Sequence, residues 1–376
     1  MPIPDTNSIY DIAFASLRGL NLAIAREMAE RVPEIDAQRF FSLSETDLRQ
    51  AYGISPAIFS GAARQKALDE ASREMEWILK HRVECIPWTS DRYPRRLLEC
   101  EDAPLMLYAI GNTDLDAPAV MSIVGTRHAT VYGTTFVERT VAEIAERLPE
   151  PPVIVSGLAL GIDIAAHRAA LASGCPTVAV MGTGLNTIYP ANHRRDAKRI
   201  IDNGGMILTE YRSIDATHRG NFLARNRIVA GLADLLLLAE SAIKGGAMTT
   251  ARLAGDYNRH VAALPGRAGD RYSQGCNHLI ANSQAALVQN GDDIISIAGW
   301  KIKETTDVPS QQTLFPELDE SGQQIVELMR QYGELHQNEL SALLNQPFHV
   351  VAATLMDLEF KRVIVQIPGG RYMLVQ

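Results

Sequence analysis

The feature that most constrains the fold is a regular alternation of short apolar runs and helical patterns between residues 105 and 300. Six runs are predicted as strands, at 119–124, 152–155, 177–181, 205–209, 235–239 and 260–264. Helical spacing fills the segments between them, at 133–147, 162–172, 194–203, 222–230 and 249–257. Runs that stay apolar throughout are typical of strands buried on both faces, so the pattern predicts an α/β fold with a parallel, Rossmann-like sheet between helical layers. Such sheets bind ligands at the carboxyl ends of their strands.

Smaller segments flank this predicted core, which we place at residues 83–300. Residues 1–82 have apolar side chains at helical spacing and a break at 53–56, which suits either a SAM-like (helix-hairpin-helix-like) module or a plain helical bundle. Residues 301–320 are polar and contain prolines, so they are predicted as a linker. Residues 321–376 show three helical patterns followed by a hairpin around a glycine turn, the order of elements in a winged helix.

Charge is unevenly distributed along the chain. The 376 residues carry a net charge of −8, which argues against a protein that coats duplex DNA through charge alone. Residues 192–227, however, hold eight basic and four acidic residues, a net charge of +4. A local basic patch on an acidic protein fits a groove that holds a phosphate chain.

Composition also disfavours several classes of protein. The four cysteines lie far apart with no Cys-x-x-Cys pair, so we expect reduced core thiols and neither a zinc site nor a disulfide framework. No apolar run reaches the length of a membrane span, and the first ten residues lack the features of a secretory signal. We therefore expect a cytoplasmic protein with no membrane contact, no metal and no cofactor.

Two glycine loops that follow predicted strands are candidates for binding an anion. In the first, Gly125 and Arg127 come directly after a strand; glycine lets a phosphate approach the backbone, and arginine offers paired donors. In the second, Ser156, Gly157 and Gly161 lead from a strand into a helix. Either loop taken alone is also compatible with a tight turn.

The helix after the second loop carries Asp163 and, four residues later, His167 on the same face. The pair would order the loop or the ligand, or would act as acid and base in a hydrolytic enzyme. An Asp in the first turn also stabilises a helix by itself. We favour ordering of the loop and assign no catalytic residue.

A third loop contains a Gly-x-Gly pair at 182–184 but lacks the third glycine of a dinucleotide fingerprint, so NAD is not the expected ligand. The loop continues through Tyr-Pro to Asn192, and the next helix opens with Arg194 and Arg195, which are placed to hold phosphates. A solvated helix face is the competing interpretation of these two arginines.

The fourth candidate is an aromatic residue followed by Arg-Asn-Arg, at Phe222, Arg225, Asn226 and Arg227. Such a set can stack a base and hold backbone phosphates. Because the two arginines cannot lie on one helix face, one of them is expected to point inward and order the loops. The fifth candidate is a glycine turn with hydroxyls, Gly246 and Thr249, which suits an anion or tight packing.

In this order the motifs resemble the DNA-processing protein A (DprA/Smf) family. The resemblance covers about residues 90–285 and rests on Ser156-Gly-Leu-Ala-x-Gly161-Ile-Asp163-x-x-Ala-His167, Tyr189-Pro190-x-Asn192, Phe222-x-x-Arg225-Asn226-Arg227, Leu264-Pro265-Gly266 and Gly275-x-Asn277-x-Leu-Ile280. The chain departs from the family pattern at Gly245, where serine is usual, and at Ser283-Gln284, where Gly-Ala is usual.

The resemblance implies a non-catalytic protein whose extended Rossmann core binds single-stranded DNA, forms a homodimer and helps to load the RecA recombinase in natural transformation and recombination. The DNA-binding residues that we expect are Gly125, Arg127, Ser156, Gly157, Gly161, Arg194, Arg195, Phe222, Arg225, Asn226 and Arg227. Those expected to order the loops are Asp163, His167, Asn192, Gly246 and Thr249.

The predicted winged helix needs a separate interpretation. Its third helix, at 349–360, carries Asp357 and Glu359 and no lysine or arginine. A helix that reads the major groove normally has basic residues against the phosphates. We expect a protein-contact or regulatory role for this unit, with weak duplex binding at most.

Two other functions are compatible with a core of this kind. A phosphoribohydrolase of the lysine-decarboxylase-like group resembles such a core but uses a glutamate soon after its glycine pair, whereas here no carboxylate follows Gly246 until Asp256. A regulator that senses a nucleotide in the core and reads duplex DNA through the winged helix is disfavoured by the acidic third helix.

Overall fold

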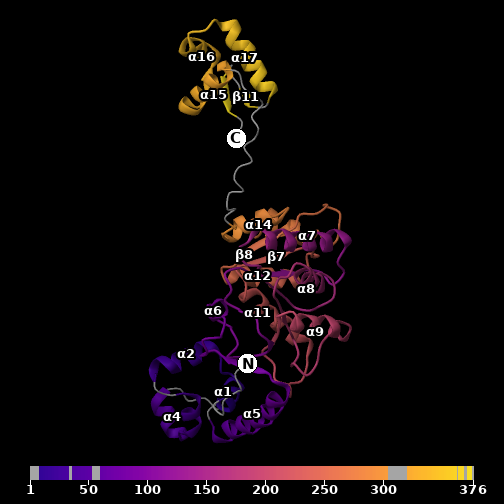
Figure 1. Cartoon of the computed structure of the whole chain (residues 1–376). Coiled ribbons are helices and arrows are strands. Elements are labelled where there is room, and N and C mark those ends of the chain that lie inside the picture. Colours follow the sequence, from indigo (N-terminus) through magenta and orange to yellow (C-terminus); the bar gives the residue numbers. More distant parts are fainter. Residues whose placement is uncertain are drawn as a thin grey trace. The chain divides into compact units, whose positions relative to one another are not determined.

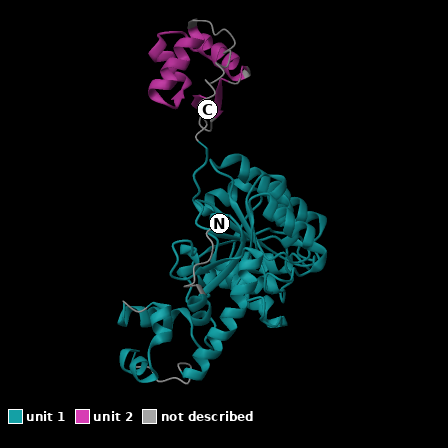
Figure 2. Cartoon of the chain, turned by 60° about the horizontal axis from the view of Figure 1, so that its bottom comes forward, with its two compact units in different colours: residues 1–303 teal, residues 304–376 magenta. Residues whose placement is uncertain are grey.

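The structure is a computed structural model that describes residues 8–33, 36–52, 60–303, 320–361, 363–367 and 371–374. The predicted break at 53–56, most of the 301–320 linker and the glycine turn of the C-terminal hairpin lie outside these residues. The chain divides into two compact units, residues 1–303 and 304–376 (Figure 2).

A nine-stranded sheet forms the centre of the first unit (Figure 1). Its order is β1-β2-β6-β5-β4-β3-β7-β8-β9. The strands from β6 to β9 pair in parallel, whereas β1 and β2 are antiparallel to their neighbours. Their bounds are β1 (Glu84–Pro87), β2 (Met106–Gly111), β3 (Val120–Val124), β4 (Val153–Ser156), β5 (Thr177–Val180), β6 (Met206–Thr209), β7 (Leu235–Leu238), β8 (His260–Ala263) and β9 (Ala286–Leu287).

The sheet confirms the predicted α/β class and all six predicted strands, with ends displaced by no more than a residue. Strands β1, β2 and β9 were not predicted. Successive side chains of the central strands are buried on opposite faces, as continuous apolar runs require. In β3, for example, Val120 and Val124 pack on one face while Met121 and Ile123 pack on the other.

Helices cover both faces of the sheet. The face that includes Met121 is covered by α7 (Val131–Arg147), α8 (Ile162–Ala172) and α14 (Gly291–Ala298), and the other by α11 (Asn226–Gly231), α12 (Gly246–Asp256) and α13 (Gln274–Ala281). At the β5–β6 end, α9 (Arg194–Asp202) packs through Ile200.

One helix prediction is wrong. The pattern at 222–230 predicts a single helix, but the structure has two short ones, α10 (Arg219–Ala224) and α11, which meet at Arg225. The backbone of Arg225 stays helical, with φ −54° and ψ −31°, while its side chain turns into the protein and is only 5% exposed. Periodicity does not reveal this break because the apolar spacing continues across it.

Five N-terminal helices pack beside β1 and β2, namely α1 (Ser8–Ala15), α2 (Leu22–Arg31), α3 (Ala37–Ser42), α4 (Glu45–Tyr52) and α5 (Gly61–His81). Their apolar core, which includes Phe40, Tyr52 and Ile78, also takes in Met106 and Tyr108 of β2. The N-terminal helices therefore share a core with the sheet.

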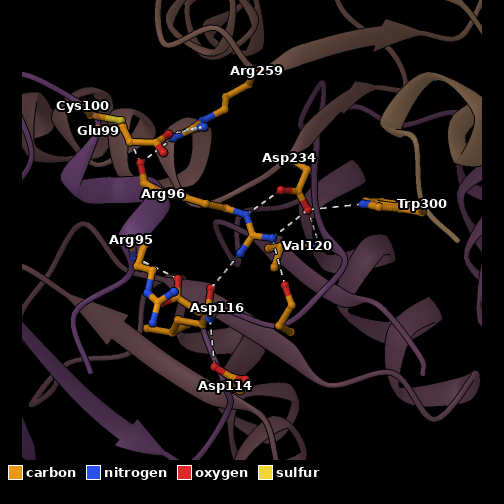
Figure 3. Close-up of polar contacts among 12 residues, drawn as sticks. Arg95, Arg96, Glu99, Cys100, Asp114, Asp116, Val120, Asp234, Arg259 and Trp300 are labelled. Carbon is orange, nitrogen blue, oxygen red and sulfur yellow. Dashed lines mark hydrogen bonds and ion pairs between the residues drawn. The ribbon is translucent and has the colours of Figure 1, made fainter. Parts of the chain in front are cut away.

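A polar cluster fastens the amino ends of the central strands (Figure 3). Asp234, directly before β7, accepts hydrogen bonds from Arg96 Nε at 2.6 Å, from Arg96 Nη2 at 3.0 Å and from the Val120 amide at 3.0 Å. The Trp300 indole donates to the same carboxylate at 3.3 Å. One carboxylate thus joins α6 (Arg95–Leu98), the start of β3 and the segment that follows α14.

Within its described residues, the second unit has three helices and a three-stranded antiparallel sheet in the order β10-β12-β11. Its elements are α15 (Glu320–Tyr332), β10 (Leu335–His336), α16 (Gln337–Leu344), α17 (Phe348–Phe360), β11 (Ile364–Ile367) and β12 (Arg371–Leu374). Leu340, Val351 and Leu355 lie in its core. Neither lysine nor arginine occurs in α17.

Candidate functional site

The order of strands creates a pocket at one edge of the sheet. The chain runs outward from β3 through β4 to β6, then returns to place β7 on the other side of β3. Ligands bind at such a switch point, outside the carboxyl ends of the strands. Here lies a pocket of about 430 Å³, which we call the central pocket. Its lining comprises Val124–His128, Ala159, Asp163, Phe222, Leu223, Arg225, Asn226, Val229, Ser241, Ala242, Lys244–Ala247, Thr250, Arg271 and Tyr272.

Close contacts between backbone segments fix the two predicted glycine loops. A Cβ on Gly125 would lie 2.5 Å from the Ile162 side chain and 2.9 Å from the Glu240 carbonyl oxygen. Gly161 has a φ of +80°, and a Cβ there would lie 2.2 Å from the Thr126 carbonyl oxygen. The loops after β3 and β4 therefore hold each other in place, and only glycine fits at their contact.

The buried side chain of Arg225 packs against these loops from the interior of the protein. Its Nη1 donates to the Val180 carbonyl oxygen at 3.1 Å, and a Cβ on Gly157 would lie 1.4 Å from the same nitrogen. Gly157 therefore leaves the space that the guanidinium fills. Burial raises the pKa of Asp163, although the nearby Arg225 and the backbone amides of Ala159 and Gly157 partly offset it. Of the two arginines in the Arg-Asn-Arg motif, Arg225 is the one that points inward.

His167 does not line the central pocket, and its ring nitrogen contacts Thr177 and not Asp163. It is fully buried in α8, and its Nδ1 is 2.7 Å from Thr177 Oγ1, which itself donates to the Ile154 carbonyl oxygen. Burial lowers the pKa of His167 to about 3. A neutral, enclosed imidazole orders α8 against β5 and offers no acid–base partner to Asp163.

Three cations surround the central pocket. Arg127, Lys244 and Arg271 line it, are exposed, and make no hydrogen bond or ion pair with the described residues. They come from three separate loops, after β3, β7 and β8. Their charges are therefore free to meet an anionic ligand.

The family model described as DNA recombination-mediator protein A matches residues 84–299, which include the whole sheet and every residue of the central pocket. The chain belongs to this family. Curated members carry the names DprA and Smf.

Individual DprA/Smf proteins are similar over most of their length. The DNA processing protein DprA of Streptococcus pneumoniae is 37% identical over 242 residues, 64% of this chain and 82% of that protein. The Smf protein of Escherichia coli is 33% identical over 297 residues, 78% of each chain. The X-ray structure of the S. pneumoniae protein has a TM-score of 0.64 at 30% identity, covering 78% of this chain and 98% of that one.

A second DprA structure is described for its single-stranded DNA binding mode. This protein, from Helicobacter pylori, is 32% identical and has a TM-score of 0.51. The match covers 58% of this chain and 97% of that chain.

An aromatic pair borders the central pocket of this DprA/Smf chain. Phe222 is half-buried, and its ring centroid lies 5.1 Å from that of Tyr189, which is exposed. A Cβ on Gly182 would lie 2.9 Å from Phe222 Cδ1, so the Gly-x-Gly loop leaves room for the ring. The exposed Leu223 and the half-buried Asn226 line the same side.

Several predicted residues lie outside the central pocket. Arg227 forms an ion pair with Glu210 in a separate cavity of about 540 Å³ beside α1, because it sits on the opposite side of the chain from Arg225. Ser156 is buried and donates to the Ile123 carbonyl oxygen at 2.6 Å, which ties β4 to β3. Arg194 and Arg195 are exposed on α9, next to Asn192 in a short 3₁₀ helix.

The helix start after β7 contributes Gly246 and the Thr250 hydroxyl to the lining of the central pocket, which does not include Thr249. Sequence reasoning also missed Arg271 and Tyr272, which lie between the two motifs quoted as Leu264-Pro265-Gly266 and Gly275-x-Asn277. The spacing of those motifs, which places an eight-residue loop at the carboxyl end of β8, is the signal that would have found them.

Over the described ranges, no helix has the length and apolar content to cross a membrane. The same residues contain no cluster of three or more His, Cys, Asp or Glu side chains arranged to hold a metal ion.

Proposed function

We propose that this chain binds single-stranded DNA at the carboxyl edge of its sheet, with the central pocket as the principal site. The observation that carries the proposal is the ring of three unpaired cations, Arg127, Lys244 and Arg271, around a pocket built from rigid glycine loops. The similarity to the H. pylori protein, whose structure is described for single-stranded DNA binding, supports the same ligand.

In this proposal the cations bind phosphates and the aromatic rings stack on bases. Arg127, Lys244 and Arg271 hold phosphates, which every DNA sequence offers, so affinity falls as salt releases counterions from the strand. Phe222 and Tyr189 offer ring faces on which an unpaired base can stack. A duplex keeps its base faces covered by neighbouring pairs, so an aromatic platform favours single strands.

A second group of residues shapes the site. Gly125, Gly157 and Gly161 permit the close loop contacts, and Arg225 and Asp163 fix them from below. The exposed Arg194 and Arg195 on α9, with Arg199 and Arg219, add a basic surface that extends the phosphate path. In this proposal the side chain of Arg227 organises the cavity with Glu210 and does not touch DNA.

The biological role that we infer is recombination mediation in DNA uptake, in which this chain acts as a homodimer through its core and loads RecA onto the bound strand. The family description supports mediation. We propose that the protein carries out no catalysis, because His167, four residues after Asp163, is enclosed and lies outside the lining of the central pocket, so the two do not form an acid–base pair there.

For the second unit we propose a winged helix that contacts protein. Three helices followed by the β11–β12 hairpin support the assignment. The side chains of α17 include Asp357 and Glu359 and no cation, which disfavours duplex readout.

Fluorescence anisotropy with labelled oligo-dT and a matched duplex, at two salt concentrations, tests the proposal. We expect tighter binding of the single strand, weaker binding at higher salt, and a loss of about tenfold in Arg127→Ala. Arg73→Ala, an exposed arginine on α5, is the matched control and should bind like the wild type. Preferential duplex binding, or binding that ignores Arg127, would overturn the proposal.

A further inference from the structure

Beside the central pocket lies a larger hollow of about 900 Å³, which we call the outer pocket. It is formed by the start of α7 and by the loop after β8, and Glu240 lies at its base. Its lining includes Val131, Tyr132, Arg267, Arg271 and Tyr272. Two of these, Arg271 and Tyr272, also line the central pocket, so the two hollows lie on either side of them.

Hydrogen bonds and ring contacts fix the loop that separates the two pockets. The side chain of Asn277 makes two hydrogen bonds with the Gly266 backbone. Its Oδ1 accepts from the Gly266 amide at 3.1 Å, and its Nδ2 donates to the Gly266 carbonyl oxygen at 2.9 Å. The Tyr272 carbonyl oxygen accepts from the Ser241 amide at 2.6 Å. The Tyr272 ring stacks with His128 at 6.0 Å and 22°, and the Arg271 guanidinium lies 5.7 Å from the centre of the same ring.

The surface of the outer pocket combines apolar faces with free cations. Val131 and Tyr132 are 81% and 52% exposed, which is unusual for apolar side chains at the start of a helix that packs on a sheet. Arg267 and Arg271 are exposed, and their guanidinium groups make no hydrogen bond or ion pair with the described residues. The one exposed carboxylate in the lining is that of Asp270.

The amino end of α7 is already occupied by a carboxylate. Glu240 accepts from the Thr130 amide at 2.8 Å and from its hydroxyl at 2.6 Å, and a Cβ on Gly133 would lie 2.4 Å from Glu240 Oε2. A phosphate is therefore not expected against this helix end. The exposed tyrosine and valine offer a base a place to stack, while the two loop arginines face its phosphates.

We propose that the outer pocket is a second subsite for the same single strand, which leaves the central pocket over the His128–Tyr272 pair and stacks a base on Tyr132. This inference rests on the proposed function, because the strand must already occupy the central pocket. It names Tyr132 as a stacking residue, Arg267 as a phosphate contact specific to the outer pocket, and Arg271 as a contact shared by both subsites.

Length dependence of binding separates the two subsites. Labelled oligo-dT of about 4 and about 16 nucleotides, the range over which comparable single-strand sites extend, is titrated into the full chain. Tyr132→Ala should weaken binding of the long strand about tenfold and leave the short one unchanged, since one stacked base contributes about that much. Tyr132→Phe keeps the ring and should bind like the wild type, although it removes the hydrogen bond from Tyr132 to the Pro265 carbonyl oxygen.

Arg267→Ala provides a second test that does not alter packing. It should lower the slope of log affinity against log salt by about 0.7 for the long strand alone, the value for one phosphate contact on a single strand. If Tyr132→Ala and Arg267→Ala both bind the two lengths like the wild type while Arg127→Ala binds both more weakly, the subsite is refuted and the proposed function stands. If Arg127→Ala binds both lengths normally, the proposed function fails as well.

Discussion

Removal of the Asp234 carboxylate should destabilise the first unit without affecting its proposed DNA site. In Asp234→Ala, three donors lose an acceptor, namely the Arg96 guanidinium, the Val120 amide and the Trp300 indole (Figure 3). A buried donor left unsatisfied costs about 1 to 3 kcal/mol. Because the Arg96 and Asp234 side chains are 16% and 25% exposed, water replaces part of each bond. We therefore take the low end and expect a total loss of about 3 kcal/mol.

Urea unfolding followed by circular dichroism measures this loss as a lower midpoint at unchanged slope. Asp292→Ala is the matched control, since its ion pair with Arg147 is at least half exposed on both sides and should contribute less than about 1 kcal/mol. Binding of oligo-dT under folding conditions should be unchanged, because Asp234 lies at the amino end of the strands and the central pocket at the carboxyl end. Equal stability losses in the two variants would refute this reasoning.

Three further predictions follow from buried groups and from the aromatic pair. Burial lowers the pKa of His167 to about 3, so the unfolded chain gains a proton first as pH falls, and stability should decline by about 1.4 kcal/mol per pH unit between 6.5 and 3; His167→Gln should flatten this decline in urea titrations. Burial raises the pKa of Cys175 and of Cys276 to about 12, so neither thiol should react with iodoacetamide at pH 8 until the protein is unfolded, as mass spectrometry would show. Phe222→Ala should weaken binding of oligo-dT, measured by anisotropy, about tenfold, whereas Phe222→Tyr should not.

The sequence predicted the parts of this fold that depend on local pattern. Each strand from β3 to β8 consists mostly of apolar residues, and those from β3 to β7 are buried along their whole length. Strand β9 has only two residues, and β1 pairs antiparallel with β2 at the end of the sheet, so both exist because β8 and β2 lie beside them. Pairing of this kind depends on tertiary contacts, which the pattern of one segment does not contain.

In the candidate site, too, the sequence predicted what depends on local pattern and not what depends on tertiary contacts. Strand ends and glycines located the loops at Gly125, Gly157 and Gly161, because a parallel sheet brings its carboxyl ends together. The roles of the arginines were harder to predict from the sequence. Spacing indicated that Arg225 and Arg227 point apart, but which of them points inward depends on the cavity that Gly157 leaves. The ion pair of Arg227 depends on Glu210, which lies at the end of a different strand.

The arginine and tyrosine of the loop after β8 were missed for another reason. Arg271 and Tyr272 follow no strand directly, and their approach to the pocket is set by the hydrogen bonds that hold the loop to Ser241 and Asn277. Such a loop conformation is a product of contacts between segments far apart in the chain.

Photo-crosslinking locates the proposed strand most directly. Oligo-dT that carries 5-iodouracil at single positions is irradiated in complex with the full chain, and the attached peptides are identified by mass spectrometry. Our account predicts crosslinks in residues 125–128, 222–226, 244–247 and 271–272, with positions farther along a long strand attaching at Tyr132. Crosslinks confined to residues 320–374 would contradict it, because the strand would then lie on the second unit and not on the sheet.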